Sequence, residues 1–484
     1  MNAPKPPCRP PAPPTAAPGG RRSTRRERMP QPKPPTPRLF YALICTLLLA
    51  TAAGPASAAG YELVEQLMSA DRKSRKAAAS QLIASGDRSL LPGLVDALFF
   101  IPGNNRGEAY KVLEALAGEK VGRNYRDWVA WIGRQESLVP KEGYVDWKLK
   151  LLTRIDRRYR NIFYRGAPIR IRLEEVVWGG VPIDGIPSLD QPLTIPGRDA
   201  SYLRDNELVF GVDLGGEQRA YPLRMLDWHE MLNDVVGGQP VTLSYCTLCR
   251  SAILYDASTK AGGAYTFGTS GLLYRSNKLM FDRQSWSLWS NLTGEAVIGR
   301  AALGERRLPM LPMTLTTWGA WLERHPETTT LALEQPGGAG FDYRPGAADR
   351  ARGGVSFPVW LKNDALKDKD EIYALVIDGR PKAYPMDRLL AEGVVNDRIG
   401  ERNLVLVAER GSGAVRAYER GELTFALSGD QLTDDQGNAW LITEHALVPA
   451  AGDPAAGLAR LPGHVAYWFG WYAFYPQTEI YGVP

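Results

Sequence analysis

Cysteine and histidine are scarce in this chain, whose 484 residues contain four of each. A single C-x-x-C stands at 246–249, and the lack of a second one excludes a tetrahedral zinc site made of two such pairs. Arg250 stands where a haem-attachment motif needs histidine. No G-x-S-x-G elbow and no Gly-Lys-Ser/Thr phosphate loop occurs, so these serine-hydrolase and nucleotide-binding motifs are absent.

A basic face is also lacking, although the formal net charge of the whole chain is +5. Residues 1–58 hold nine Lys and Arg and a single acid, Glu27. The remainder has 49 basic and 52 acidic residues, a net charge of −3. The basic character therefore belongs to the N-terminal segment, and we expect no nucleic-acid partner.

The chain has little long apolar sequence, and its clearest apolar run, residues 39–50, is short for a bilayer span. Lys33 and Arg38 precede this run, and a small-x-small signature follows at 56–58. This order predicts that residues 1–59 are a leader with a signal peptide, and that the protein is periplasmic or secreted. The alternative is an uncleaved segment that anchors it in the membrane. Cleavage would remove Cys8 and Cys45 and leave two cysteines in an oxidising compartment.

Three regions follow the leader. Residues 60–165 have the rhythm of helical hairpins, either HEAT-like or a plain bundle, and such a surface would suit docking of an unknown protein partner. Residues 166–335 and 336–484 instead show β-branched and aromatic alternation, interrupted by Gly, Asp and Pro. We expect an α+β protein: a helical, HEAT-like domain followed by two tandem, duplicated α+β domains, the second degenerate.

The duplication is predicted from blocks that recur in the same order. Residues 220–222 and 233–234 return at 383–385 and 396–397, both at an offset of 163. Two tryptophans of the first half, Trp318 and Trp321, return at an offset of 150 as Trp468 and Trp471. The framework residues recur, whereas the reactive groups do not. These alignments place Glu409 opposite Cys246 and Ser412 opposite Cys249. They also place Glu392 opposite His229 and Tyr475 opposite His325. The chemistry is therefore expected in the first half.

Within one copy we expect strands at 208–212 and 218–223, a helix at 227–235 that Gly237 and Gly238 terminate, and strands at 241–245 and 251–255. Cys246 and Cys249 would then lie on a turn between two strands. That placement lacks the helix N-terminus that acidifies a thioredoxin-type thiol, although Arg250 could stabilise a thiolate. Three interpretations stay open: a soft-metal or soft-electrophile site, a redox thiol pair, and a structural disulfide or inert thiols.

His229 is the third candidate metal ligand, because the expected helix places it beside the cysteine strand. An ordinary surface histidine is the alternative. Met310 and Met313 could offer thioethers to copper, but methionines at this spacing more often fill a core. Copper or another soft metal ion is the only cofactor that these residues suggest, and they leave open whether the protein is an enzyme.

Further polar residues of the first half could line a pocket. Several gather around the glycine turn at 268–271. Two more lie further along the chain: an acid, Glu295, and a histidine, His325, each of which could belong to a site. The alternative for each is a structural role. These candidates are Ser270, Tyr274, Asn277, Asp282, Arg283, Glu295 and His325.

Residues 244–252 strongly resemble a family of exported bacterial proteins known as DUF-3179, a domain of unknown function. The supporting blocks are 220–222, 228–234, 267–274, 282–284, 288–295, 316–318 and 325–326. The family usually has proline and a small residue where this chain has Thr247 and Arg250. The resemblance covers roughly residues 165–335 with an echo to 484, and it implies export but no activity.

A remoter resemblance is to the fold shared by the organomercurial lyases and the copper chaperone of nitrous oxide reductase maturation. The lyases have a Cys-Ala-Leu-Asp stretch that is similar to residues 246–249. This likeness implies chemistry with soft metals and agrees with the sulfur donors. The main alternatives are a periplasmic thiol-disulfide oxidoreductase and a non-catalytic binding scaffold.

Overall fold

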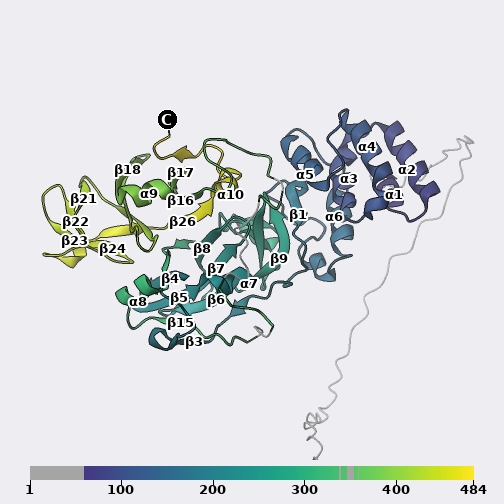
Figure 1. Cartoon of the computed structure of the whole chain (residues 1–484). Helices are drawn as coiled ribbons and strands as arrows, with labels where there is room; N and C mark the ends of the chain where they lie inside the picture. Colours follow the sequence, from purple (N-terminus) through teal and green to yellow (C-terminus); the bar gives the residue numbers. More distant parts are fainter. Residues whose placement is uncertain (1–58, 337–339, 346–353, 358, 484) are drawn as a thin grey trace, which may run out of the picture. The chain divides into compact units, whose positions relative to one another are not determined.

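The computed structural model describes residues 59–336, 340–345, 354–357 and 359–483, and the predicted leader lies outside them. No helix in this part of the chain is long and apolar enough to cross a membrane. The α-helices α1 to α6 come first in the described chain (Figure 1). Their bounds are α1 Ala59–Leu67, α2 Arg72–Ser85, α3 Leu91–Leu98, α4 Gly107–Ala117, α5 Tyr125–Arg134 and α6 Tyr144–Leu152.

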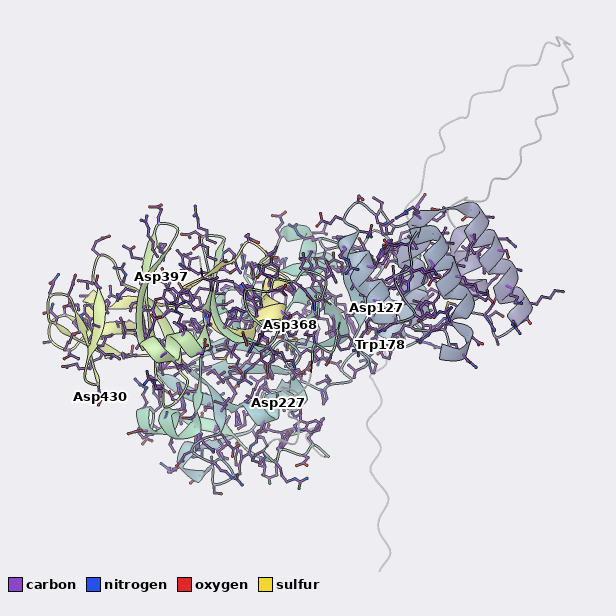
Figure 2. All side chains as sticks on the ribbon, turned by 45° about the horizontal axis from the view of Figure 1, so that its top comes forward. Asp127, Trp178, Asp227, Asp368, Asp397 and Asp430 are labelled. Atoms are coloured by element: carbon purple, nitrogen blue, oxygen red, sulfur yellow. The ribbon has the colours of Figure 1, made fainter. Side chains whose placement is uncertain are left out.

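The helices and the first sheet share one hydrophobic core. That sheet has the order β1-β9-β10-β11-β12. Trp178, labelled in Figure 2, packs edge-on against Phe99 with ring centres 4.9 Å apart, and Tyr159 donates a hydrogen bond to the carbonyl of Ser270 at 2.8 Å. The strands are β1 Val176–Trp178, β9 Phe267–Tyr274, β10 Asn277–Asp282, β11 Leu288–Ser290 and β12 Ala296–Ile298.

Two further sheets complete the first half. One has the order β13-β8-β7-β6-β2 and the other β14-β4-β5-β15-β3. The first contains β2 Leu189–Asp190, β6 Met231–Val236, β7 Gln239–Cys246, β8 Ser251–Asp256 and β13 Met310–Leu311. The second contains β3 Thr194–Pro196, β4 Leu208–Leu214, β5 Glu217–Pro222, β14 Thr314–Thr317 and β15 Thr329–Leu331, and the helices of this half are α7 Leu223–His229 and α8 Trp318–Arg324.

The second half has a four-stranded sheet, β26-β16-β17-β27, and an eight-stranded sheet, β18-β19-β20-β25-β24-β23-β22-β21. Asn396 on the first strand of the larger sheet exchanges two hydrogen bonds with Phe425 on its last strand, so this sheet nearly closes into a barrel. The helices are α9 Met386–Glu392 and α10 Trp468–Tyr472. The strands are β16 Glu371–Ile377, β17 Arg380–Pro385, β18 Val394–Ile399, β19 Arg402–Ala408, β20 Val415–Glu419, β21 Phe425–Ser428, β22 Gln431–Asp434, β23 Ala439–Ile442, β24 Ala446–Pro449, β25 Leu458–Leu461, β26 His464–Tyr467 and β27 Glu479–Ile480.

The expected fold class, α+β with an N-terminal HEAT-like domain and two tandem α+β copies, is wrong. The described chain is mostly β, with five sheets and only ten α-helices. After α6, each α-helix has no more than seven residues. The predicted helix at 227–235 illustrates the cause: α7 ends at His229, Glu230 takes a left-handed conformation, and 231–236 is the strand β6.

The recurring residue pairs make equivalent bonds in the two halves. Tyr221 donates to Asp234 at 2.9 Å, and Tyr384 donates to Asp397 at 2.7 Å. Asn233 exchanges two hydrogen bonds with the backbone of Phe267, as Asn396 does with Phe425. The shared residues therefore hold the framework. The predicted domain bounds, 60–165, 166–335 and 336–484, stay a prediction.

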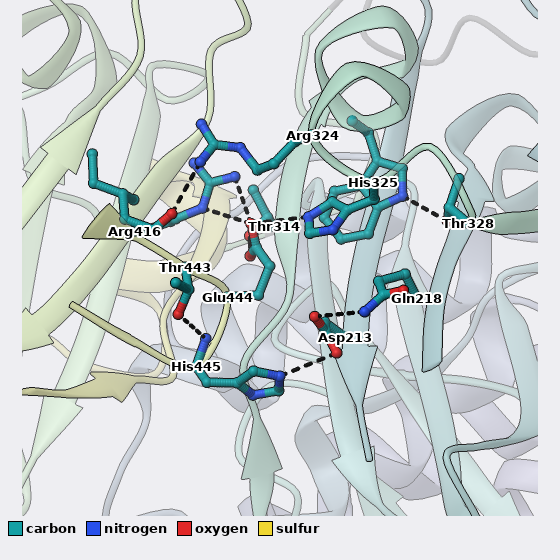
Figure 3. Close-up of polar contacts among 12 residues, drawn as sticks. Asp213, Gln218, Thr314, Arg324, His325, Thr328, Arg416, Thr443, Glu444 and His445 are labelled. Atoms are coloured by element: carbon teal, nitrogen blue, oxygen red, sulfur yellow. Dashed lines mark hydrogen bonds and ion pairs between the residues drawn. The ribbon is translucent and has the colours of Figure 1, made fainter. Parts of the chain in front are cut away.

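A buried charge cluster joins the two halves (Figure 3). Glu444 accepts hydrogen bonds from Arg416 at 2.8 Å, from Arg460 at 2.6 Å and from Thr314 of the first half at 2.6 Å. Burial alone would raise the pKa of Glu444, but the arginines hold it well below its usual range. His325, a predicted pocket residue, lies 3.8 Å from the same carboxylate and therefore belongs to this junction.

Candidate functional site

The cysteine pair lies on a turn between β7 and β8, as the sequence predicts. The last register pair of the two strands is Cys246 with Ser251. The backbone N–H of Cys249 donates to the carbonyl of Cys246 at 3.2 Å, which closes the turn. Arg250 completes it with a φ of 53°, a conformation that is costly outside glycine. An ion pair of 2.9 Å with Glu371 of the second half holds Arg250 in place.

Both thiols are buried and neither is in a disulfide. Cys249 donates a hydrogen bond to the carbonyl of Ser276 at 3.1 Å. Burial opposes ionisation of Cys246, yet the interaction with the neighbouring Cys249 thiol brings the pKa of Cys246 below its ordinary value. Burial and the neighbouring sulfur raise the pKa of Cys249 well above its ordinary value. The two thiols are therefore unequal, and Cys246 is the more acidic.

A cavity of about 130 Å³ lies against one of the two cysteines. Cys246 contributes to its lining, whereas Cys249 does not. The walls are mostly apolar, and Glu230, Thr247, Thr269 and Lys278 are the polar residues among them besides the cysteine. The lining residues are Gly179, Val181, Ile186, Glu230, Cys246, Thr247, Leu248, Thr269, Gly271, Leu272, Leu273, Lys278 and Phe357.

A buried lysine lies in the same cavity. Lys278 donates to the carbonyls of Glu230 and Tyr245, the second at 2.9 Å, and its nitrogen lies 3.3 Å from the sulfur of Met231. Burial lowers the pKa of Lys278 to about 8. Its positive charge in turn helps to lower the pKa of Cys246.

Glu230 supplies the acid of the cavity. Its carboxylate accepts a hydrogen bond from Thr247 at 2.8 Å, within the cysteine turn itself. The left-handed conformation of Glu230 at the end of α7 turns the chain into β6 and allows this contact. Sequence analysis missed both Glu230 and Lys278. The signal for Lys278 is a lysine directly before the apolar run 279–281, since a lysine is rarely buried unless its amine is paired.

The second half forms the wall behind the cysteines. The N–H of Tyr467 donates to the carbonyl of Cys249 at 2.8 Å. A Cβ added to Gly470 would come within 2.8 Å of the Cβ of Cys249, so only glycine permits this approach. The small apolar cluster around the pair comprises Cys246, Cys249, Val359, Tyr467, Phe469 and Ala473. The site is thus built by both halves, although only the first carries the sulfurs.

Asn277 is the predicted pocket residue that the structure brings to the cysteines. Its side-chain amide donates to Ser251 at 3.1 Å and accepts from Asn291 at 2.9 Å. A hydrogen bond with Asn277 opposes the rise in the pKa of Cys249. None of the three residues of this buried polar network lines the cavity.

His229 does not join the cysteine pair. Its Nδ1 lies 2.8 Å from the carbonyl of Pro187, and its Nε2 contacts the hydroxyl of Tyr343. Both ring nitrogens are therefore engaged elsewhere. Within the described residues, no three His, Cys, Asp or Glu side chains are grouped as a metal site would need. The role of His229 as a ligand stays a prediction.

The other predicted pocket residues have structural contacts. Ser270 bonds the backbone of Leu272 at 3.1 Å beside an irregularity in the β9–β10 ladder. Asp282 accepts from Trp289 at 2.8 Å and from the turn at Ser285. The remaining contacts are Tyr274 with Phe474, Arg283 with Asp184, and Glu295 with Thr293.

A comparison with protein families identifies the chain. The family described as "Protein of unknown function (DUF3179)" matches residues 183–478, which is more than half of the sequence. The chain belongs to this family. The match to DUF3179 spans both halves, in agreement with a site to which both contribute.

No curated protein and no solved structure matches the chain. The remoter resemblance to the copper chaperone and the organomercurial lyases is therefore not shown. The family assignment of DUF3179 carries no activity with it, so the chemistry of the cavity has to be argued from its own residues.

Proposed function

We propose that this DUF3179 protein is an exported thiol-disulfide oxidoreductase that acts on small disulfides. One observation carries the proposal: Cys246 lines the cavity together with the buried Lys278, whereas Cys249 does not line it. A thiolate is the nucleophile in disulfide exchange, and a protected second thiol suits the resolving step. The cavity of about 130 Å³ favours a compact substrate over a protein disulfide.

The exchange would proceed in two steps. The Cys246 thiolate attacks one sulfur of the substrate disulfide, forms a mixed disulfide and releases the other sulfur as a thiolate. The Cys249 thiolate then attacks Cys246, forms the intramolecular disulfide and releases the second substrate thiol. Two electrons pass to the substrate, which takes up two protons. A dithiol reductant in the compartment that receives the exported protein would reduce the Cys246–Cys249 disulfide again. Lys278 would stabilise the attacking thiolate through its charge.

The test is to trap the mixed disulfide. In a Cys8→Ser/Cys45→Ser background, the reduced Cys249→Ser protein is treated with bis(2-hydroxyethyl) disulfide and its intact mass is measured. We expect one hydroxyethylthio adduct per chain, mapped by peptide analysis to Cys246. The chain with both cysteines should lose two hydrogens and carry no adduct. The Cys246→Ser variant is the matched control and should remain unmodified; an adduct on Cys249 at a comparable rate would contradict the assignment.

A soft-metal site is the second candidate. The observation in its favour is that the two buried sulfurs are neighbours and that no third His, Cys, Asp or Glu of the described residues is grouped with them. Two thiolates suit a low-coordinate ion such as Cu(I). Titration of the reduced protein with Cu(I) should give one ion per chain, lost in the Cys246→Ser/Cys249→Ser variant. Equal stoichiometry in both proteins would rule out this candidate.

The leader and the N-terminal helices bear on where the protein acts and what it binds. Residues 1–59 would direct the chain to the periplasm or outside the cell, or hold it at the membrane if they stay uncleaved. The helices α1–α6 would offer a surface to an unknown protein partner. A non-catalytic scaffold would need only these surfaces, and a variant without both cysteines would then keep its function in the cell.

A further inference from the structure

A buried histidine, His464, has no hydrogen-bond partner for its ring among the described residues, although the ring packs edge-on against Trp471. His464 opens β26, and its residue is 6% exposed. Burial lowers the pKa of His464 to about 4, so the imidazole is neutral near pH 7 and has one donor and one acceptor. A buried polar group without partners has lost the hydrogen bonds that it makes with water in the unfolded chain, and this loss costs free energy.

His464 lines a groove of about 460 Å³. This volume falls within the range of small-molecule sites, and such sites combine apolar walls with a few placed polar groups. Two sheets supply the walls: β8 and β13 from the first half, β16 and β26 from the second. The apolar lining includes Tyr255, Leu308, Met310, Val376, Pro462 and Tyr475.

The edge of the groove carries an exposed cation. Arg307 lines the groove, and its Nε donates to the carbonyl of Thr293 at 3.0 Å. None of the ion pairs among the described residues includes Arg307. The acid of the lining, Asp378, lies 3.9 Å from Arg402 and so already has a cationic neighbour. Glu295 lies opposite Arg307 in an isolated backbone bridge, but its carboxylate accepts a hydrogen bond from Thr293. Of the two charged residues in the lining, Arg307 and Asp378, Arg307 is the one without an ion pair to a described residue.

We propose that this groove is a second binding site and takes a small amphiphilic anion. The apolar body of the ligand packs between Tyr255 and Tyr475, and one of its polar atoms bonds to His464. Its carboxylate or sulfonate lies toward Arg307. The site shares no lining residue with the cysteine cavity, so the inference stands independently of the thiol chemistry.

The test uses 8-anilinonaphthalene-1-sulfonate, an aromatic anion, as the probe in a fluorescence titration of the full chain. We expect saturable binding of one probe per chain. His464→Leu removes the polar contact, and Arg307→Gln removes the charge, so each should weaken binding at least tenfold. Arg306→Gln is the matched control, because Arg306 is the adjacent exposed arginine and does not line the groove.

Unfolding of the variants is measured alongside binding. Arg307 is exposed, so its replacement should leave the melting temperature unchanged and report on binding alone. The absence of saturable binding to the unmodified chain would overturn the proposal. Unchanged affinity in either His464→Leu or Arg307→Gln would overturn it as well, as would an equal loss in Arg306→Gln.

Discussion

Glu444→Gln is expected to lower the free energy of unfolding by about 3–5 kcal/mol, the cost typical of breaking a buried ion pair from one side. The side chains of Glu444, Arg416 and Arg460 are only 2–3% exposed. Without the carboxylate, two arginines would remain in the junction with too little opposing charge. Glu409 contacts Arg416 as well, but it is partly exposed and faces Arg324. Denaturant unfolding measures the loss.

The control for this prediction is Glu479→Gln. Glu479 is 68% exposed and lies 3.6 Å from Lys382, so its ion pair is screened by water. We expect a change below about 1 kcal/mol, as for surface pairs in general. A loss below 1 kcal/mol in Glu444→Gln would mean that the junction does not depend on the buried charge.

Gly271→Ala is expected to cost about 3 kcal/mol and to open the cysteine cavity, because steric overlap adds to backbone strain at this position. Gly271 has a φ of 72°, and an added Cβ would lie 2.1 Å from the carbonyl oxygen of Val181. Its own carbonyl accepts a hydrogen bond from Gly179 at 2.8 Å. The segment that carries Gly179 and Val181 lines the cavity, so it would have to move away from Cys246.

Two measurements check this expectation. Denaturant unfolding gives the stability, and the rate of alkylation of Cys246 by iodoacetamide reports access to the cavity and should rise. Gly216→Ala is the matched control, because Gly216 has a φ of 82° but no atom within 4 Å of an added Cβ. The Gly216→Ala variant measures only the free-energy cost of a left-handed backbone at a residue other than glycine, about 1–2 kcal/mol. Equal losses in both variants, without faster alkylation, would contradict the steric argument.

The cysteine turn could be predicted from the sequence because its signals are local. Residues 241–245 and 251–255 each have the β-branched and aromatic character of strands, and the C-x-x-C joins them. The segment at 227–235 is ambiguous in sequence. Its apolar residues fit either period, and Gly237 with Gly238 is also typical of a helix end. The structure uses these glycines, both with positive φ, as the hairpin turn between β6 and β7.

The surroundings of the cysteines could not be predicted, because they come from distant segments. Lys278 reaches the site through the pairing of β9 and β10, and Glu230 through the left-handed residue that ends α7. Gly470 approaches Cys249 only because α10 packs on the turn. None of these contacts leaves a periodic pattern in the sequence. The same holds for His325, whose neighbour Glu444 belongs to the other half.

Gly470 makes the packing of the cysteine turn depend on a segment that contains no sulfur. A substitution at 470 that adds even one carbon would press on Cys249. A gene fragment that encodes the first half alone would inherit both cysteines but not the surface that encloses them, and its thiols would meet solvent instead of the wall that α10 provides.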